Sequence, residues 1–182
     1  MDKPIGDIHF KFMAFCLKIR DLLLPAKTIL KEAEIKPGFT VLDFGCGRGN
    51  FIIPAAELVG KTGKVYALDI HSLAIQAVQN AASKKGLKNI ETICSGCAIG
   101  LEKCCVDVVL LYDTLHMLTD PNAVLEELHR VLKPNGILSF SDHHMKENEI
   151  ITKITNRRLF GLLKKGKRTY SFLKKQVLKT RF

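Results

Sequence analysis

Between residues 40 and 141, the sequence alternates short apolar runs with longer segments of helical periodicity. The runs at 40–44, 64–70, 89–94, 106–112 and 137–141 predict five strands. Helices are expected at 27–35, 51–59, 73–85 and 122–132, with Ser72 and Asp120 as N-caps. The run 106–112 is almost wholly apolar, which is typical of a central strand in a parallel sheet. This alternation predicts an α/β fold with a doubly wound, mostly parallel sheet.

The pattern changes after residue 141. A helix is expected at 146–155, followed by two strand-like runs at 159–163 and 168–173. Only four residues separate these runs, so they predict a C-terminal antiparallel hairpin. The main domain is expected to span residues 26–182. Residues 1–25, with helical apolar spacing from Phe10 to Leu24, are expected to form a lid or a flanking helix.

Charge is distributed unevenly along the chain. All 18 acidic residues and 17 of the 28 basic residues lie in the first 150 positions, and the last 32 positions hold only basic charge. A basic C-terminus could attract nucleic acid or another anion, although a solvated edge that aids solubility is the plainer interpretation. No apolar run is long enough to span a membrane and no secretory signal is evident. A cytoplasmic chain with six reduced cysteines is therefore expected.

A glycine-rich loop follows the first predicted strand. Gly45, Gly47 and Gly49 would let the chain turn tightly and let a ligand approach the backbone closely. The N-terminus of a helix follows, which favours a negatively charged ligand group. The dinucleotide fingerprint needs a further glycine where this chain has Asn50. A nicotinamide-dependent oxidoreductase is therefore disfavoured.

Two acidic residues flank this loop at the ends of neighbouring strands. Asp43 suits a ligand with an ammonium group, and Asp69 suits the two hydroxyls of a ribose. S-adenosylmethionine carries both groups. The structural alternative is that Asp43 caps a turn and Asp69 caps a helix.

Four segments in order carry a family resemblance: residues 41–50, 65–70, 106–118 and 128–136. Together they resemble the class I, seven-strand, Rossmann-like S-adenosylmethionine-dependent methyltransferases, and the terminal hairpin resembles strands six and seven of that family. The resemblance covers about residues 26–174. It implies that the chain is an enzyme that uses S-adenosylmethionine as its cofactor.

The resemblance also assigns roles to single residues. The methionine part would lie against Asp43 and the loop, the ribose on Asp69 and the adenine on Ile70, while Tyr112 and Asp113 would border the methyl group. The family usually has an acid near the end of strand three, where this chain has Gly96, so Ser95 or backbone groups would replace it or affinity would be reduced. The cofactor-binding residues expected are Asp43, Gly45, Cys46, Gly47, Gly49, Asp69, Ile70, Gly96, Cys97 and Tyr112.

Histidines and cysteines offer further chemistry. His116 follows the fourth strand and could act as a general base, or could simply pack there. His143 and His144 lack an evident third ligand, so no metal is expected and a surface or supporting role is favoured. Cys94 and Cys97, with Cys104 and Cys105, could bind zinc or arsenite, although small buried cysteines are the favoured interpretation.

A small-molecule methyl acceptor is expected because nearly the whole chain is needed for the cofactor fold. Methyl transfer needs alignment and exclusion of water rather than a covalent enzyme nucleophile. RNA methylation through the basic C-terminus is the main alternative. It is disfavoured because residues 113–116 lack the Asn/Asp-Pro-Pro-aromatic run of the amino-methylating nucleic-acid enzymes. A non-catalytic cofactor-binding module is the third hypothesis.

Overall fold

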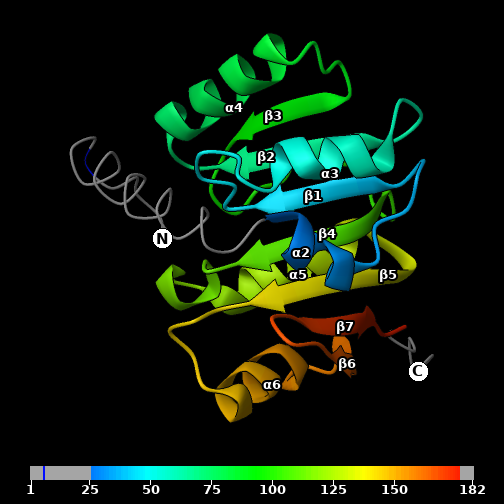
Figure 1. Cartoon of the computed structure of the whole chain (residues 1–182). Helices are drawn as coiled ribbons and strands as arrows, with labels where there is room; N and C mark the ends of the chain where they lie inside the picture. The colour runs from blue at the N-terminus through cyan, green and yellow to red at the C-terminus, as the bar shows by residue number, and fades with distance from the viewer. Residues whose placement is uncertain (1–5, 7–25, 177–182) are drawn as a thin grey trace.

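A computed structural model describes Gly6 and residues 26–176 of the 182-residue chain. A single seven-stranded sheet has the order β3-β2-β1-β4-β5-β7-β6 (Figure 1). The strands β1 to β5 are parallel, and β7 is antiparallel to both of its neighbours. Their bounds are β1 (Thr40–Phe44), β2 (Lys64–Asp69), β3 (Ile90–Cys94), β4 (Val106–Tyr112), β5 (Leu132–Ser141), β6 (Phe160–Lys165) and β7 (Tyr170–Lys174). The predicted mostly parallel sheet with a C-terminal hairpin is confirmed.

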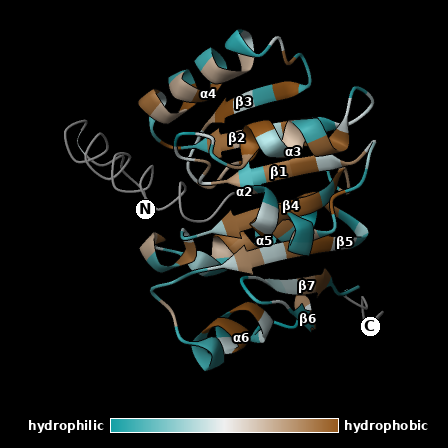
Figure 2. Cartoon of the chain, in the orientation of Figure 1, coloured by the Kyte–Doolittle hydropathy of each residue, from teal (hydrophilic) through white to brown (hydrophobic). Residues whose placement is uncertain are grey.

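Helices cover both faces of the sheet, as a doubly wound fold requires. On one face, α2 (Ala26–Leu30), the short 3-10 helix η1 (Lys31–Ala33), α3 (Ile52–Val59) and α4 (Ser72–Lys84) contribute to one apolar cluster. On the other face, η2 (Leu115–Met117), α5 (Pro121–Val131) and α6 (Glu147–Thr155) contribute to a second cluster. Figure 2 shows hydrophobic residues gathered on the strands, with hydrophilic residues in the loops.

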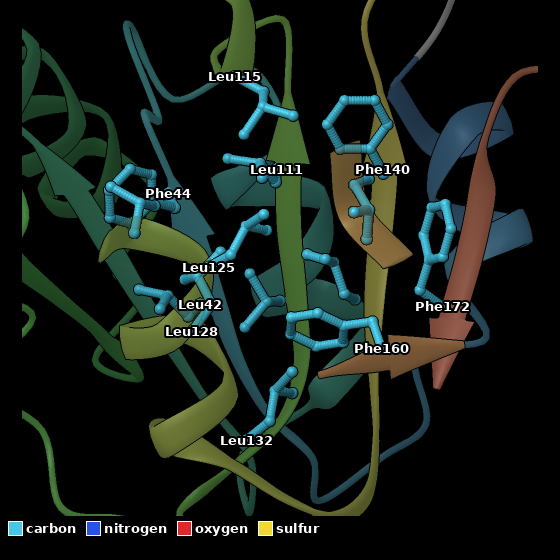
Figure 3. Close-up of a cluster of buried hydrophobic side chains, with 14 of the residues drawn as sticks. Leu42, Phe44, Leu111, Leu115, Leu125, Leu128, Leu132, Phe140, Phe160 and Phe172 are labelled. Carbon is cyan, nitrogen blue, oxygen red and sulfur yellow. The ribbon is translucent and has the colours of Figure 1, made fainter. Parts of the chain in front are cut away.

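The central strand β4 supplies both clusters. Leu111 faces the cluster that includes Phe140, and Leu110 faces the cluster beneath α3. Because successive side chains of a strand point to opposite faces, a strand supplies both clusters only where apolar residues follow one another, as residues 108–111 of β4 do. Figure 3 shows the larger cluster, where side chains of β1, β4, β5, β6 and β7 meet those of α5.

Local signals set the ends of the helices. Asp120 caps α5, since its Oδ1 accepts the backbone N–H of Ala123 at 3.0 Å, as predicted. The predicted cap of α4 is wrong: His71 is the cap, and its Nδ1 accepts the backbone N–H of Leu73 at 3.2 Å. Ser72 is the first residue of that helix.

The strand β5 begins earlier than its apolar run predicts. Leu132 already pairs with Val106, and an irregularity follows before Ile137 pairs with Val108. Asn135, in the polar stretch between them, has a left-handed backbone with φ of 65°. The polar stretch is therefore an irregular extension of the strand rather than a loop before it.

Glu32 joins η1 to the turn between β6 and β7. Its carboxylate accepts the backbone N–H groups of Lys167, Arg168 and Thr169 and the hydroxyl of Thr169, at 2.9 to 3.2 Å. Burial alone would raise the pKa of Glu32, but these hydrogen bonds outweigh it and lower the pKa. The segment before β1 is thereby fixed to the hairpin that follows α6.

The carboxyl ends of the parallel strands lie at one edge of the sheet. The chain runs from β1 to β2 on one side, while β4 lies on the other side of β1. Such a reversal of strand order opens a crevice where ligands of open α/β sheets bind. In the described part of the chain, no helix is both long and apolar enough to cross a membrane. The predicted lid at 1–25 lies outside the described residues, apart from Gly6.

Candidate functional site

A cavity of about 410 Å³ lies at this edge of the sheet, lined by segments that follow β1 to β5. Its size is within the usual range of ligand pockets, roughly 300–1,000 Å³. The structure brings together nine of the predicted site residues around it: Asp43, Gly45, Cys46, Gly47, Asp69, Ile70, Gly96, Tyr112 and His116. Gly49 and Cys97 are not among the lining residues.

Asp43, near the end of β1, is only 2% exposed. Its Oδ2 is buried and has no hydrogen-bond partner within the described ranges. Burial, together with the negative charge of Asp69, raises the pKa of Asp43 to about 7. A buried carboxylate oxygen without a partner is costly, and a cationic donor in the cavity would satisfy it.

The glycine loop is held in place by the end of β2. Gly45 and Cys46 donate their backbone N–H groups to the carbonyl oxygen of Leu68, at 2.8 and 2.9 Å. Gly47 donates its N–H to Oδ2 of Asp69 at 2.8 Å. A Cβ built on Gly47 would meet no atom of residues 26–176 within 4 Å, so among these residues the loop is open toward the cavity at that point.

Gly49, unlike Gly47, has a role in packing. A Cβ at position 49 would lie 2.7 Å from Cγ2 of Val78, so this glycine lets the loop pack against α4. The structure therefore gives Gly49 a packing role that sequence reasoning missed. Its predicted cofactor contact stays a prediction.

Asp69 uses both carboxylate oxygens within the protein. Besides the bond from Gly47, its Oδ1 accepts the backbone N–H of His71 at 2.8 Å. An ionised carboxylate has about four acceptor positions, so capacity remains for the hydroxyls of a ribose. The tethering of the glycine loop is a second role that the sequence did not indicate.

The segments after β2 and β3 form the far end of the cavity. Ile70, Ser95 and Gly96 line it, and a Cβ at Gly96 would lie 3.5 Å from Cδ1 of Ile70. The backbone N–H of Ser95 donates to the carbonyl oxygen of Asp69 at 3.0 Å. This end is therefore lined by backbone as well as by an aliphatic side chain.

The cysteines are divided between two edges of the sheet. Cys94 and Cys97 lie at the carboxyl end of β3, whereas Cys104 and Cys105 precede β4 at the opposite edge. Of these four cysteines, Cys94, Cys97 and Cys104 are exposed and Cys105 is half-buried, so the prediction that they are small buried residues is wrong. The four thiols cannot share one zinc ion. Among residues 26–176, no group of three or more histidine, cysteine or acidic side chains could hold a metal ion.

Tyr112 and Cys46 contribute packing surfaces rather than reactive groups. The Tyr112 hydroxyl is hydrogen-bonded to Oγ of Ser139 at 2.7 Å, while its ring meets that of Phe51 edge-on with centroids 4.9 Å apart. Burial raises the pKa of the Tyr112 phenol. Burial, and then the charges of Asp43 and Asp69, raises the pKa of the Cys46 thiol. Both groups are therefore neutral at physiological pH.

Two histidine–carboxylate pairs join the segments that follow β4 and β5. Nδ1 of His116 lies 2.8 Å from Oδ2 of Asp142, and Nδ1 of His143 lies 2.6 Å from Oδ1 of Asp113. Each segment thus provides one acid and one histidine to the other. Sequence reasoning missed Asp142. Its position directly after an apolar strand, like Asp113 after β4, was the available signal.

A family model described as a methyltransferase domain matches residues 35–177, which include the whole sheet and the cavity. The chain belongs to this methyltransferase family. The predicted membership of the class I S-adenosylmethionine-dependent methyltransferases is confirmed, and S-adenosylmethionine is the cofactor of the family.

A solved methyltransferase shares most of this fold. The crystal structure of a SAM-dependent methyltransferase from Aquifex aeolicus is 29% identical, with a TM-score of 0.74. The match covers 85% of this chain and 91% of that one. The likeness therefore extends over nearly the complete domain.

Curated methyltransferases match over shorter stretches. Aklanonic acid methyltransferase of Streptomyces sp. (strain C5) is 41% identical over 64 residues, which are 35% of this chain and 29% of that protein. Ribosomal RNA large subunit methyltransferase E of Lawsonia intracellularis is 36% identical over 87 residues, or 44% and 40% of the two chains. The matched stretches thus cover less than half the length of these methyltransferases.

The residues around the cavity fit the cofactor of the family. Oδ2 of Asp43, which no described residue contacts by a hydrogen bond, can accept one from the cofactor ammonium, and the open backbone at Gly47 leaves room for the amino-acid part of the cofactor. Asp69 retains acceptor capacity at the neighbouring strand end.

Proposed function

We propose that this methyltransferase domain transfers the methyl group of S-adenosylmethionine to a small organic acceptor. The observation that carries the proposal is the buried carboxylate oxygen of Asp43, which has no hydrogen-bond partner in the part of the chain that the structure describes and lies beside an open glycine loop. The similarity to aklanonic acid methyltransferase over 64 residues supports this choice of acceptor, because the name of that enzyme indicates a small-molecule acceptor.

Residues at the ends of β1, β2 and β3 have proposed roles in holding the cofactor. Asp43 accepts from the ammonium, and backbone groups of Gly45, Cys46 and Gly47 border the methionine part. Asp69 accepts from the ribose, while the adenine packs against Ile70 beside Gly96 and Ser95. When bound, the cofactor supplies a methyl group on a positively charged sulfur, which a lone pair of the acceptor can attack in line.

The remaining residues have proposed parts on the acceptor side. The Tyr112 ring forms an apolar wall near the reacting groups. His116, which lines the cavity after β4, takes up the proton that an acceptor must lose. The protein otherwise aligns the two reactants and excludes water.

Calorimetric titration with S-adenosylmethionine and with S-adenosylhomocysteine tests the cofactor site. The wild-type protein should bind both compounds. Asp43→Asn should lose at least about tenfold in affinity, because a charge-assisted hydrogen bond contributes about 1.5–3 kcal/mol. Asp120→Asn is the matched control, since asparagine caps a helix as well as aspartate. Absence of binding by the wild type, or unchanged binding by Asp43→Asn, would contradict the cofactor site.

An RNA acceptor is the second candidate, favoured by the formal net charge of +10 and by the matched ribosomal RNA methyltransferase. Against it, four basic side chains after residue 150 form ion pairs with acidic residues in the first 150 positions. The pairs are Lys153 with Glu149, Arg157 with Glu126, Lys164 with Glu34 and Lys165 with Glu147. RNA binding measured against salt separates the two candidates. We expect weak binding, whereas a steep loss of affinity with salt would support phosphate contacts.

A non-catalytic module would also bind the cofactor. Incubation with methyl-labelled S-adenosylmethionine and a panel of small acceptors distinguishes it. Transfer of label to an acceptor is expected. Cofactor binding without any transfer would favour the non-catalytic hypothesis.

A further inference from the structure

His116 and Asp142 form a fixed histidine–carboxylate pair at one end of the cavity. We propose that the methyl acceptor is a hydroxyl compound, a phenol or an enol on an apolar body, and that Asp142 is a positioning residue that orients His116 to remove its proton. This inference rests on the proposed methyl transfer, and it names the chemical class of the acceptor.

Asp142 holds His116 and the loop after β5 together. Its Oδ2 is 2.8 Å from Nδ1 of His116 and accepts the backbone N–H of the same residue at 3.3 Å. Its Oδ1 accepts the backbone N–H of His144 at 3.1 Å. The Asp142 side chain is fully buried, with 0% exposure, so these bonds fix the imidazole without competition from water.

The pairing also decides which ring nitrogen of His116 can accept a proton. A carboxylate at Nδ1 holds the proton of the neutral imidazole there, which leaves the lone pair on Nε2. His116 lines the cavity with a side chain that is 25% exposed. Within residues 26–176, Nε2 has no hydrogen-bond partner, so it can accept a proton from a molecule in the cavity.

Neighbouring rings restrict the orientation of the His116 ring. The His144 ring lies against it, with centroids 4.3 Å apart, and the His143 ring lies 3.9 Å from that of His144. His143 is in turn held by Asp113, at the end of β4. The titratable groups around His116 are therefore Asp142, His143 and His144 from the loop after β5, and Asp113 from its own segment.

A fixed base favours a hydroxyl acceptor over an amine or a thiol. A neutral amine already has a free lone pair, and a thiol with a pKa near 8.5 is partly ionised without help. A phenol, with a pKa near 10, must lose its proton as it reacts. The apolar side chains of Met117, Leu118 and Phe51 also line the cavity and suit an apolar body.

Each methyl transfer releases one proton from the acceptor. A lone pair of the hydroxyl oxygen forms the new bond to the methyl carbon, and the electron pair of the carbon–sulfur bond passes to sulfur. The hydroxyl proton goes to Nε2 of His116, which releases it to water after the product leaves.

Absorbance of 4-nitrophenol tests the base without turnover. The protein is saturated with S-adenosylhomocysteine, and the phenol is added at a pH where the free compound is half ionised. Wild-type protein should raise the phenolate absorbance, because the proton moves to His116, whereas His116→Gln should not. Binding of the neutral phenol, equal absorbance in both proteins, or no binding to the wild type would overturn the proposal. The affinity for S-adenosylhomocysteine, measured by calorimetry, should be unchanged in His116→Gln. This control separates failure of the base from failure of the cofactor site.

Methylation rates across a series of phenols provide the second readout. His116→Gln should lose about 100-fold or more on weakly acidic phenols, and much less on 4-nitrophenol, which ionises without a base. Asp142→Asn should follow the same pattern, and His129→Gln, a histidine on α5 outside the cavity, is the control. An equal loss on every phenol would indicate a structural role only. Transfer of label to amines or thiols alone, or to none of the phenols, would overturn the acceptor class.

Discussion

Oδ2 of Asp69 accepts the backbone N–H of Gly47 at 2.8 Å, so the acid that ends β2 holds the loop that follows β1. One carboxylate thereby stabilises the fold and is also a proposed ligand contact. The shape of the glycine loop depends on the neighbouring strand rather than on glycine content alone.

Asp69→Asn should therefore loosen the loop before any ligand is added. An amide can accept from only one of the two N–H groups at Gly47 and His71, because its NH2 group faces the other. We expect faster hydrogen–deuterium exchange in residues 45–51 and at least about tenfold weaker S-adenosylmethionine binding. Unchanged exchange together with weaker binding would show that Asp69 serves the ribose only.

Gly47→Ala and Gly49→Ala should separate binding from stability. Both residues have positive φ, at 52° and 83°. Alanine at 47 would meet no atom of the described residues, so it should cost only about 1–2 kcal/mol of stability while it obstructs the cofactor. Alanine at 49 would lie 2.7 Å from Val78 and should lower the melting temperature further. Thermal unfolding and calorimetry on both variants check this, and equal effects on stability would contradict the assignment.

Removal of the Asp43 charge should stabilise the cofactor-free protein. The folded-state pKa of about 7 lies above the ordinary aspartate pKa of 3.8, so between these pH values the folded state holds a proton that the unfolded state has lost. Stability therefore falls as pH rises from about 4 to 7. Above pH 7, Asp43→Asn should be more stable than wild type by up to about 4 kcal/mol, since one unit of pKa shift corresponds to about 1.4 kcal/mol. Denaturant unfolding at several pH values measures the difference, which should vanish near pH 4.

Cofactor binding should depend on pH through the same carboxyl group. The ammonium of the cofactor requires ionised Asp43, so affinity should fall by up to about tenfold per pH unit below pH 7. Calorimetry in buffers of different ionisation enthalpy should detect the proton that is released on binding. In Asp43→Asn this proton release should be absent. A pH-independent affinity in the wild type would contradict the role of Asp43.

Glu32→Gln should weaken the attachment of the C-terminal hairpin. The carboxylate accepts four hydrogen bonds from residues 167–169, and an amide replaces part of that acceptor capacity with a donor. We expect a loss of about 1–3 kcal/mol in the free energy of unfolding at neutral pH. Because the folded pKa is lowered, wild type should lose this advantage as pH falls below about 4.5, and the two proteins should then converge. Glu34→Gln, an exposed neighbour with one ion pair, is the control.

Much of the fold was predictable because apolar periodicity marks strands and helices directly. The bounds of β1 and β4 agree with the predicted runs, since polar or turn residues end each run abruptly. The early start of β5 was not predictable, because Leu132 is followed by the polar stretch 133–135 and the register is irregular before Ile137. The cap of α4 was missed because a histidine acts as the acceptor only where its ring turns back onto the helix.

The candidate site was predictable where function depends on the position of a residue along one strand. Asp43, Gly47 and Asp69 follow from strand ends and a glycine loop. The pairing of Asp142 with His116 depends on the alignment of Tyr112 with Ser141 across β4 and β5. Sequence periodicity contains no information on that alignment, so the pair became visible only in three dimensions.

The place of β7 between β5 and β6 has a consequence for synthesis of the chain. When β6 leaves the ribosome, its future neighbour has not yet been made, and β5 still has an unpaired edge. Both strands remain exposed until residues 170–174 emerge. A nascent chain that stalls just before this point would therefore present two open strand edges, which favour association with other chains.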